Sequence, residues 1–277
     1  MLCSASCDFW GYPRGDSQHV MWIEEPVLAI VSERNISLAW HDIRARYRRS
    51  VLGPSWLTIS VAVQIGALGL VYGSLFHMNV AKYLPHLAAS MTVWALIAGM
   101  INEGCTSFIA SESYLKQGAL PKAMFPARVV LRSLFNFGHD LVIVVIVLAV
   151  WPPAFGWPTL LVFPGLALLA VNGLWVGLLV GMLCARFRDL PPIVASIMQV
   201  AFFVTPVIWI PNALSGNAAT LLALNPFAVF MSLVRDPLLG EAVPASRWAI
   251  ALVITLVGWT LAFAVFARFR ARITYWL

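Results

Sequence analysis

The chain of 277 residues is 61% hydrophobic and only 11% charged, whereas soluble proteins average about 25% charged residues. This composition excludes an ordinary soluble enzyme, and it makes the net charge of +6 a poor indicator of nucleic-acid binding. Residues 141–185 and 190–234 carry no acidic or basic side chain, and each run exceeds the about 20 apolar residues that cross a bilayer. The sequence therefore predicts an all-α polytopic membrane protein.

The N-terminal residues divide into a tail and a basic amphipathic segment. Residues 1–23 lack the basic and apolar blocks of a signal peptide, so we expect a cytoplasmic tail, with Met21 as an alternative start. In residues 24–54, apolar positions recur every three or four residues, and the arginines mostly avoid that stripe. We predict a helix that lies in the membrane interface and ends at Gly53-Pro54.

A transmembrane domain is expected over residues 55–277. Its six predicted spans cover residues 56–76, 85–109, 134–151, 159–184, 193–210 and 248–267. The uncharged run 141–185 would be about 68 Å long as one helix, twice the bilayer core, so a hairpin is predicted at the proline-rich stretch 151–158. Between the last two spans, Asn225-Pro226 interrupts an apolar stretch that is too short to cross, which predicts two re-entrant half-helices.

The distribution of positive charge predicts the orientation. Six spans place both termini on one side of the membrane, together with fifteen of the 18 lysines and arginines. Only Lys82, Arg235 and Arg247 fall on the other side. Because cytoplasmic loops carry the excess of basic residues, both termini are expected in the cytoplasm.

Polar residues interrupt the spans and the longest cytoplasmic loop. The loop from Glu112 to Arg132 is basic, and prolines 121 and 126 predict a short helical piece between two bends. Glu103 and Asp140 fall toward the cytoplasmic ends of their spans, where Arg128 and Arg132 are expected to neutralise them. Such groups serve either interhelical hydrogen bonding or a substrate pathway.

Several strings resemble one known family. The longest is D-I-R-x-R-Y-R-R-S-x-L-G-P-x-W at residues 42–56, followed by shorter strings at 120–128, 185–189, 205–209 and 225–227. In this order and register they resemble the bacterial ABC-2-type permeases that export polysaccharides, such as O-antigen, capsule and teichoic acid. The resemblance extends from about Glu33 to the C-terminus and implies the six-helix fold of that family.

The resemblance also implies the partners. Permeases of this kind are homodimers in the inner membrane that bind two copies of a separate ATPase, which holds ATP and Mg²⁺. The chain itself has no G-x-x-x-x-G-K phosphate loop, because none of its lysines follows a glycine. We therefore expect no catalytic residue, no metal and no cofactor on this chain.

Three groups of site residues follow from the resemblance and the residue chemistry. The ATPase-coupling segment is expected at Leu120, Pro121, Lys122, Phe125, Pro126 and Arg128. The interface helix, which would also steer a substrate phosphate, offers Arg44, Arg46, Tyr47, Arg48 and Arg49. A substrate pathway is suggested at Trp56, Tyr72, Trp94, Asn102, Glu103, Trp175 and Trp209. Tryptophan and tyrosine also anchor helices at membrane interfaces, which is the alternative role for the aromatic members.

The expected function is export of a polysaccharide or a lipid-linked glycan, powered by the partner ATPase. An ABC-2 permease for a drug or a lipid is the first alternative, and it has the same architecture. A membrane-embedded glycosyl or phosphoryl transferase is the second, but it needs clustered carboxylates or histidines. The 12 acidic residues and 5 histidines of this chain are scattered, which disfavours an enzyme.

Overall fold

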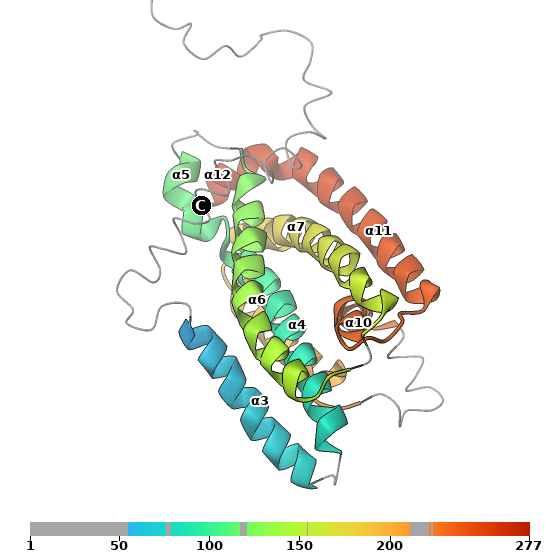
Figure 1. Ribbon diagram of the computed structural model, residues 1–277. Coiled ribbons are helices and arrows are strands. Elements are labelled where there is room, and N and C mark those ends of the chain that lie inside the picture. Colours follow the sequence, from blue (N-terminus) through green and yellow to red (C-terminus); the bar gives the residue numbers. More distant parts are fainter. Residues whose placement is uncertain (1–54, 76–78, 117–120, 154, 211–221, 223) are drawn as a thin grey trace, which may run out of the picture.

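The computed structural model describes residues 55–75, 79–116, 121–153, 155–210, 222 and 224–277. Every regular element in these ranges is a helix (Figure 1), which confirms the all-α prediction. The predicted tail and interface helix, residues 1–54, lie outside the described part of the chain.

Five described helices are long and apolar enough to cross a membrane. They are α3 (Ser55–Leu75), α4 (Val80–Thr106), α6 (Met124–Val150), α7 (Val162–Arg186), which the 3₁₀ turn η3 (Trp157–Leu161) precedes, and α11 (Ala245–Phe269). The predicted fifth span corresponds to α8 (Leu190–Val204), whose 15 residues reach about 23 Å and fall short of a ~30 Å apolar core. The predicted hairpin at residues 151–158 does separate α6 from α7.

Two helices begin five or more residues earlier than the sequence predicts. Helix α4 starts five residues before the predicted span, and α6 starts ten residues before it. The sequence analysis places a span limit at Pro85 and a bend at Pro126, but each proline lies within the first two turns of its helix. A proline there removes no intrahelical hydrogen bond, or only one, because the first amides of a helix have no acceptor.

Helix α4 forms the centre of the bundle. In its membrane-length window 72% of the residues are buried, against 17% in α3 and 22% in α11, which lie at the periphery. Helix α7 crosses α4 closely, since a Cβ added at Gly104 would lie 3.2 Å from the Cα of Gly177. Small residues at such a crossing let two helix backbones approach and gain van der Waals contact in lipid.

The short helix α10 (Pro226–Leu238) packs against α4, α7 and α11 (Figure 1). Asn225 caps it: the side-chain oxygen accepts from the Phe227 amide at 3.0 Å, and Nδ2 donates to Thr205 Oγ1 at 3.1 Å. It occupies the place of one predicted half-helix, whereas the other falls mainly on residues 211–221 and 223, outside the described part. Re-entry into the membrane stays a prediction.

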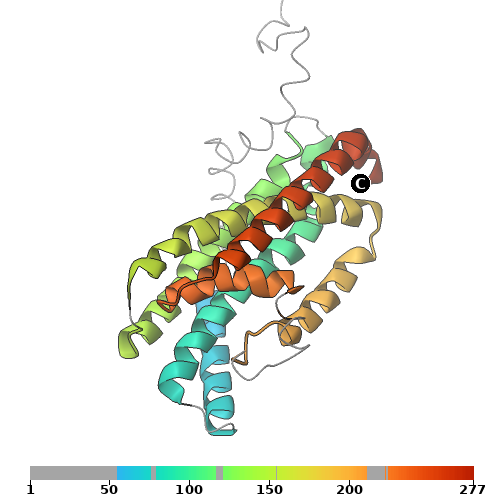
Figure 2. The ribbon, with the colours of Figure 1, turned by 90° about the vertical axis from the view of Figure 1, so that its right-hand side faces the viewer.

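The bundle has two ends that differ in structure. At the α5–α12 end, the short helices α5 (Glu112–Lys116) and α12 (Ile273–Trp276) pack against each other (Figure 1). At the other, which we call the Trp151 end, α4 begins at Val80 and α6 ends at Val150. Helix α8 follows the C-terminal end of α7, runs along one edge of the bundle (Figure 2) and contacts α4.

Candidate functional site

The Pro121–Arg128 segment turns tightly and leads directly into α6. The Met124 amide donates to the Pro121 carbonyl at 3.1 Å and closes the turn. Phe125 is only 2% exposed, and its ring packs edge-on against Phe108 with 6.3 Å between the ring centroids. The segment is therefore part of the packed end of the bundle, and Phe125 belongs to its core.

Lys122 ties this segment to the C-terminal region. Its Nζ donates a hydrogen bond to the carbonyl oxygen of Arg270, 148 residues away in the chain. Partial burial, and secondarily the Arg270 charge, lower the pKa of the Lys122 ammonium below its ordinary value, because both disfavour the charged form. The hydrogen bond fixes the position of the turn relative to the end of α11.

The C-terminal helix α12 completes the same cluster, which the sequence reasoning missed. Ile273 is fully buried in one apolar cluster with Phe108, Leu115 and Phe125. The Arg186 guanidinium lies 5.5 Å from the Trp276 ring centroid, a cation–π arrangement that joins α7 to α12. The basic run before Ile273 predicts the end of the last span, and the short helix that follows this run was not predicted.

A pocket of about 280 Å³ opens beside the segment. Its lining residues are Glu103, Thr106, Ser107, Ala110, Ser111, Tyr114, Phe125, Arg128, Val129 and Arg132. Seven of the ten lining residues carry a hydroxyl, carboxylate or guanidinium group, although Arg128 is only 9% exposed. The pocket can therefore offer directed hydrogen bonds to a polar group that approaches from the α5–α12 end.

The expected charge pairings hold for one carboxylate and fail for the other. Arg132 binds Glu103, with 2.6 Å between Nη2 and Oε2, which confirms that pair. Asp140 instead accepts a hydrogen bond from Thr58 Oγ1 of α3 at 3.3 Å. One turn of a helix separates Arg128 from Arg132, and Asp140 lies two further turns along α6, beyond the reach of either arginine.

The tryptophans proposed for a substrate pathway mostly serve packing. Trp94 is 8% exposed and lies 5.7 and 5.8 Å from the ring centroids of Phe202 and Phe227. Trp175 donates from Nε1 to Asn172 Oδ1 at 2.8 Å, and Trp209 donates to the Phe203 carbonyl at 3.1 Å. The ring contacts of Trp94 join α4 to α8 and α10. The hydrogen bond of Trp175 lies within α7, and that of Trp209 holds the segment after α8 against the end of that helix.

The remaining pathway candidates are divided between α3 and α4. Trp56, 57% exposed, and partly buried Tyr72 sit at opposite ends of α3, about 24 Å apart along the helix axis. Asn102 and Glu103 lie on α4, where the Asn102 Oδ1 is buried without a hydrogen-bond partner and Glu103 lines the small pocket. The seven candidates therefore do not form one site, and their role in transport stays a prediction.

Six predicted site residues lie outside the described part of the chain. They are Arg44, Arg46, Tyr47, Arg48, Arg49 and Leu120.

Helix α5 presents an exposed polar surface at the same end. Its Glu112 accepts a hydrogen bond from Lys116, one turn later. That bond and the Lys116 charge lower the pKa of the Glu112 carboxyl below its ordinary value. Tyr114, between them in the sequence, is 50% exposed, whereas Leu115 is buried in the cluster. An exposed aromatic flanked by charges is suited to contact a protein partner.

Comparison with known proteins adds a family assignment to this geometry. A family model described as the ABC-2 type transporter matches residues 34–239. The O-antigen export system permease protein RfbA of Myxococcus xanthus is 25% identical over 203 residues, which are 71% of this chain and 76% of the relative. The protein of the same name from Klebsiella pneumoniae is 21% identical over 201 residues, 70% of this chain and 76% of the relative.

Proposed function

Because the chain belongs to the ABC-2 type transporter family, we propose that it is the permease subunit of an exporter for a polysaccharide or a lipid-linked glycan. The observation that carries the proposal is that the two relatives named above are permeases of O-antigen export. Five helices of membrane length among the described residues support a transmembrane subunit. A drug or a lipid as substrate has no specific observation in its favour.

We place the protein in the bacterial inner membrane with the α5–α12 end in the cytoplasm. That end carries most of the described basic residues: Lys116, Lys122, Arg128, Arg132, Arg186, Arg188, Arg268, Arg270 and Arg272. Lys82 lies at the Trp151 end. The excess of positive charge on one side is the usual mark of a cytoplasmic face.

The energy comes from a separate ATPase that binds at the α5–α12 end. This chain lacks a phosphate loop, so ATP and Mg²⁺ belong on the partner. The contact surface is formed by the exposed side of α5 and by the turn that begins at Pro121, whereas Phe125, Pro126 and Arg128 lie beneath this surface and support it. Two ATPase copies and a homodimer of this chain complete the assembly.

Packing lets a displacement of that surface reach the whole bundle. Phe125 and Ile273 join the surface to Phe108 just after α4 and to the C-terminal part of α7 through one buried cluster. Helix α6 continues from the turn for 27 residues, about 40 Å, to the Trp151 end. Since packed interfaces switch between discrete arrangements, closure of the ATPase dimer would shift α4, α6 and α7 together.

The arginines of the predicted interface helix, Arg44, Arg46, Arg48 and Arg49, complete the proposal on the cytoplasmic side. Guanidinium groups pair with phosphate through two parallel hydrogen bonds. Together with Tyr47 they would hold the helix against anionic lipid and guide the phosphate of a lipid-linked substrate toward the bundle.

Reconstitution in liposomes tests this function. The purified chain is measured for ATP hydrolysis alone and with the ATPase encoded beside it, before and after addition of a lipid-linked glycan from the same cells. Hydrolysis that requires the partner and rises with glycan supports the proposal. Hydrolysis that ignores glycan but rises with small amphiphiles would identify a drug or lipid exporter. No association with an ATPase would contradict the assignment as a whole.

A further inference from the structure

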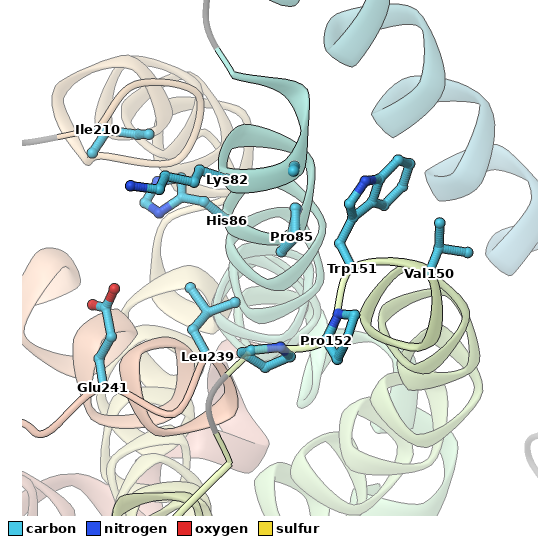
Figure 3. Close-up of a pocket in the computed structure, with 11 residues that line it drawn as sticks. Lys82, Pro85, His86, Val150, Trp151, Pro152, Ile210, Leu239 and Glu241 are labelled. Carbon is cyan, nitrogen blue, oxygen red and sulfur yellow. The ribbon is translucent and has the colours of Figure 1, made fainter.

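A second and larger pocket lies at the Trp151 end of the bundle. Its volume is about 540 Å³, within the roughly 300–1,000 Å³ of pockets that hold small ligands. The lining residues are Ala81, Lys82, Pro85, His86, Val150, Trp151, Pro152, Pro153, Ile210, Leu239 and Glu241. They come from the start of α4, the end of α6 with the prolines after it, the segment after α8 and the turn after α10 (Figure 3), so four separate segments define the pocket.

Two charged side chains of this pocket, Lys82 and Glu241, are exposed and open to a ligand. Salt bridges among the described residues include neither of them. His86 is 7% exposed and lies against the backbone of Pro206 and Trp209, so it forms part of the pocket wall.

The backbone fixes Glu241 at the rim. Gly240 adopts a left-handed conformation, with φ of 77°, directly after α10. The Glu241 amide then donates to the Asp236 carbonyl at 2.8 Å, which closes the end of the helix. This turn places the Glu241 side chain on the same side of the start of α4 as Lys82 and His86, whereas Trp151 lines the pocket on the other side of that helix (Figure 3).

The charges and apolar groups decide the class of ligand. Lys82 and Glu241 carry opposite charges on one pocket, so neither an anion nor a cation is favoured as a whole. Trp151 and the neighbouring prolines supply apolar faces in another part of the same pocket (Figure 3). A sugar has this same combination, since its C–H face packs on an aromatic ring while its hydroxyls donate and accept hydrogen bonds.

From this combination we propose that the Trp151-end pocket binds sugar units of the glycan as the glycan leaves the permease. This rests on the proposed function, which places the pocket on the outer side. Trp151 packs against one sugar unit, while Lys82 and Glu241 hydrogen-bond the hydroxyls of a neighbouring unit. The pocket is built on the far ends of α4 and α6, whose other ends adjoin the proposed ATPase surface, so the ATPase cycle reshapes it and sugar is released.

Photocrosslinking in exporting cells tests the proposal. Leu239, which lines the pocket, is replaced by the photoreactive residue p-benzoylphenylalanine, and exposed Trp157 outside it receives the same residue as a control. Irradiation is expected to join glycan to the Leu239 variant and not to the Trp157 variant. If the cells export glycan normally but neither variant captures it, the pocket assignment is wrong and the exporter function stands. Wild-type cells that export no glycan through this chain would overturn the exporter function itself.

Binding and export by pocket variants give a second measurement. The probe is a set of oligosaccharides cut by mild acid from the surface polysaccharide of the same cells, added to the permease–ATPase complex in nanodiscs. Trp151→Ala and the isosteric Glu241→Gln should each weaken binding by about three- to tenfold and slow export, whereas Trp157→Ala should not. Equal binding by all variants would contradict the proposal. So would binding that disappears at about 1 M salt, where the Debye length is about 3 Å, since that marks a charge-driven ligand.

Discussion

Arg132 of α6 donates two hydrogen bonds to one carboxylate oxygen of Glu103 of α4, from Nε at 2.8 Å and from Nη2 at 2.6 Å. The pair lines the small pocket beside the proposed ATPase surface and joins the central helix to the one that follows the coupling turn. It is only partly exposed, with 17% of the arginine and 27% of the glutamate side chain accessible. Solvent therefore screens it less than a surface pair.

Glu103→Gln should lower stability and weaken coupling together. The substitution leaves Arg132 partly buried without its carboxylate, at a cost of about 1–3 kcal/mol, between the values for exposed and buried pairs. Thermal unfolding in detergent and glycan-stimulated ATP hydrolysis measure the two effects. Glu112→Gln, on the exposed surface of α5, is the matched control for stability. A Glu103→Gln protein with unchanged unfolding temperature and unchanged stimulation would show that the pair is dispensable.

Ile273→Ala should loosen the α5–α12 end. Ile273 is fully buried among Phe108, Leu115 and Phe125, and truncation of such a side chain costs about 2–5 kcal/mol. We expect weaker stimulation of the ATPase, because the cluster supports its contact surface. Tyr275→Ala, at a residue 89% exposed in the same short helix, should change neither stability nor stimulation. Equal behaviour of the two variants would contradict this role of α12.

Gly258→Leu should disrupt the contact of α11 with α7. The Trp175 ring lies directly over Gly258, so even a Cβ there would overlap the ring. Overpacking of this kind costs about 1–3 kcal/mol and displaces the indole from its hydrogen bond with Asn172. Gly138→Leu serves as a control, because an added Cβ meets nothing within 4 Å there. The measurement is the fraction of monodisperse protein after heating in detergent, and equal losses in both variants would argue against this contact.

Asp236→Asn should destabilise the C-terminal end of α10. Asp236 holds Arg235 through Oδ1 at 2.7 Å and Arg247 through Oδ2 at 2.9 Å, and Arg235 is 5% exposed. Breaking a buried pair costs about 3–5 kcal/mol, since a buried charge loses its partner. The exposed Asp189→Asn is the control, and thermal unfolding is the measurement. Arg235 also donates to the Pro206 carbonyl at 3.0 Å, so the turn after α8 should loosen as well and admit proteases.

Lys122 should lose its proton at a lower pH than an ordinary lysine. Burial and the Arg270 charge both disfavour the ammonium form, so the neutral amine that reacts with acylating reagents appears below the usual pKa of 10.5. Mass spectrometry of the acylated protein over a pH series measures the midpoint. In Arg270→Gln one of the two causes is removed, and the midpoint should move upward. A midpoint at or above 10.5 in the unsubstituted chain would contradict the buried position of this amine.

The sequence by itself determined the class of protein, its helices and its family. Long uncharged runs permit only membrane helices here, because backbone polar groups in lipid must be satisfied within a segment. The helix limits were less certain: Pro126 marks a bend in sequence terms, but in the structure it occupies the first turn of α6, where its missing amide has no cost.

Only the tertiary structure decided which residues meet. No local pattern predicts that Ile273 and Phe125 share one buried cluster, that Lys122 reaches the carbonyl of Arg270 or that Trp175 lies over Gly258. These contacts join residues from 83 to 148 positions apart. They depend on helix crossings, which hydropathy cannot specify because it does not distinguish one apolar helix face from another. The Trp151-end pocket also depends on tertiary structure, because the four segments that line it are distant from one another in the chain.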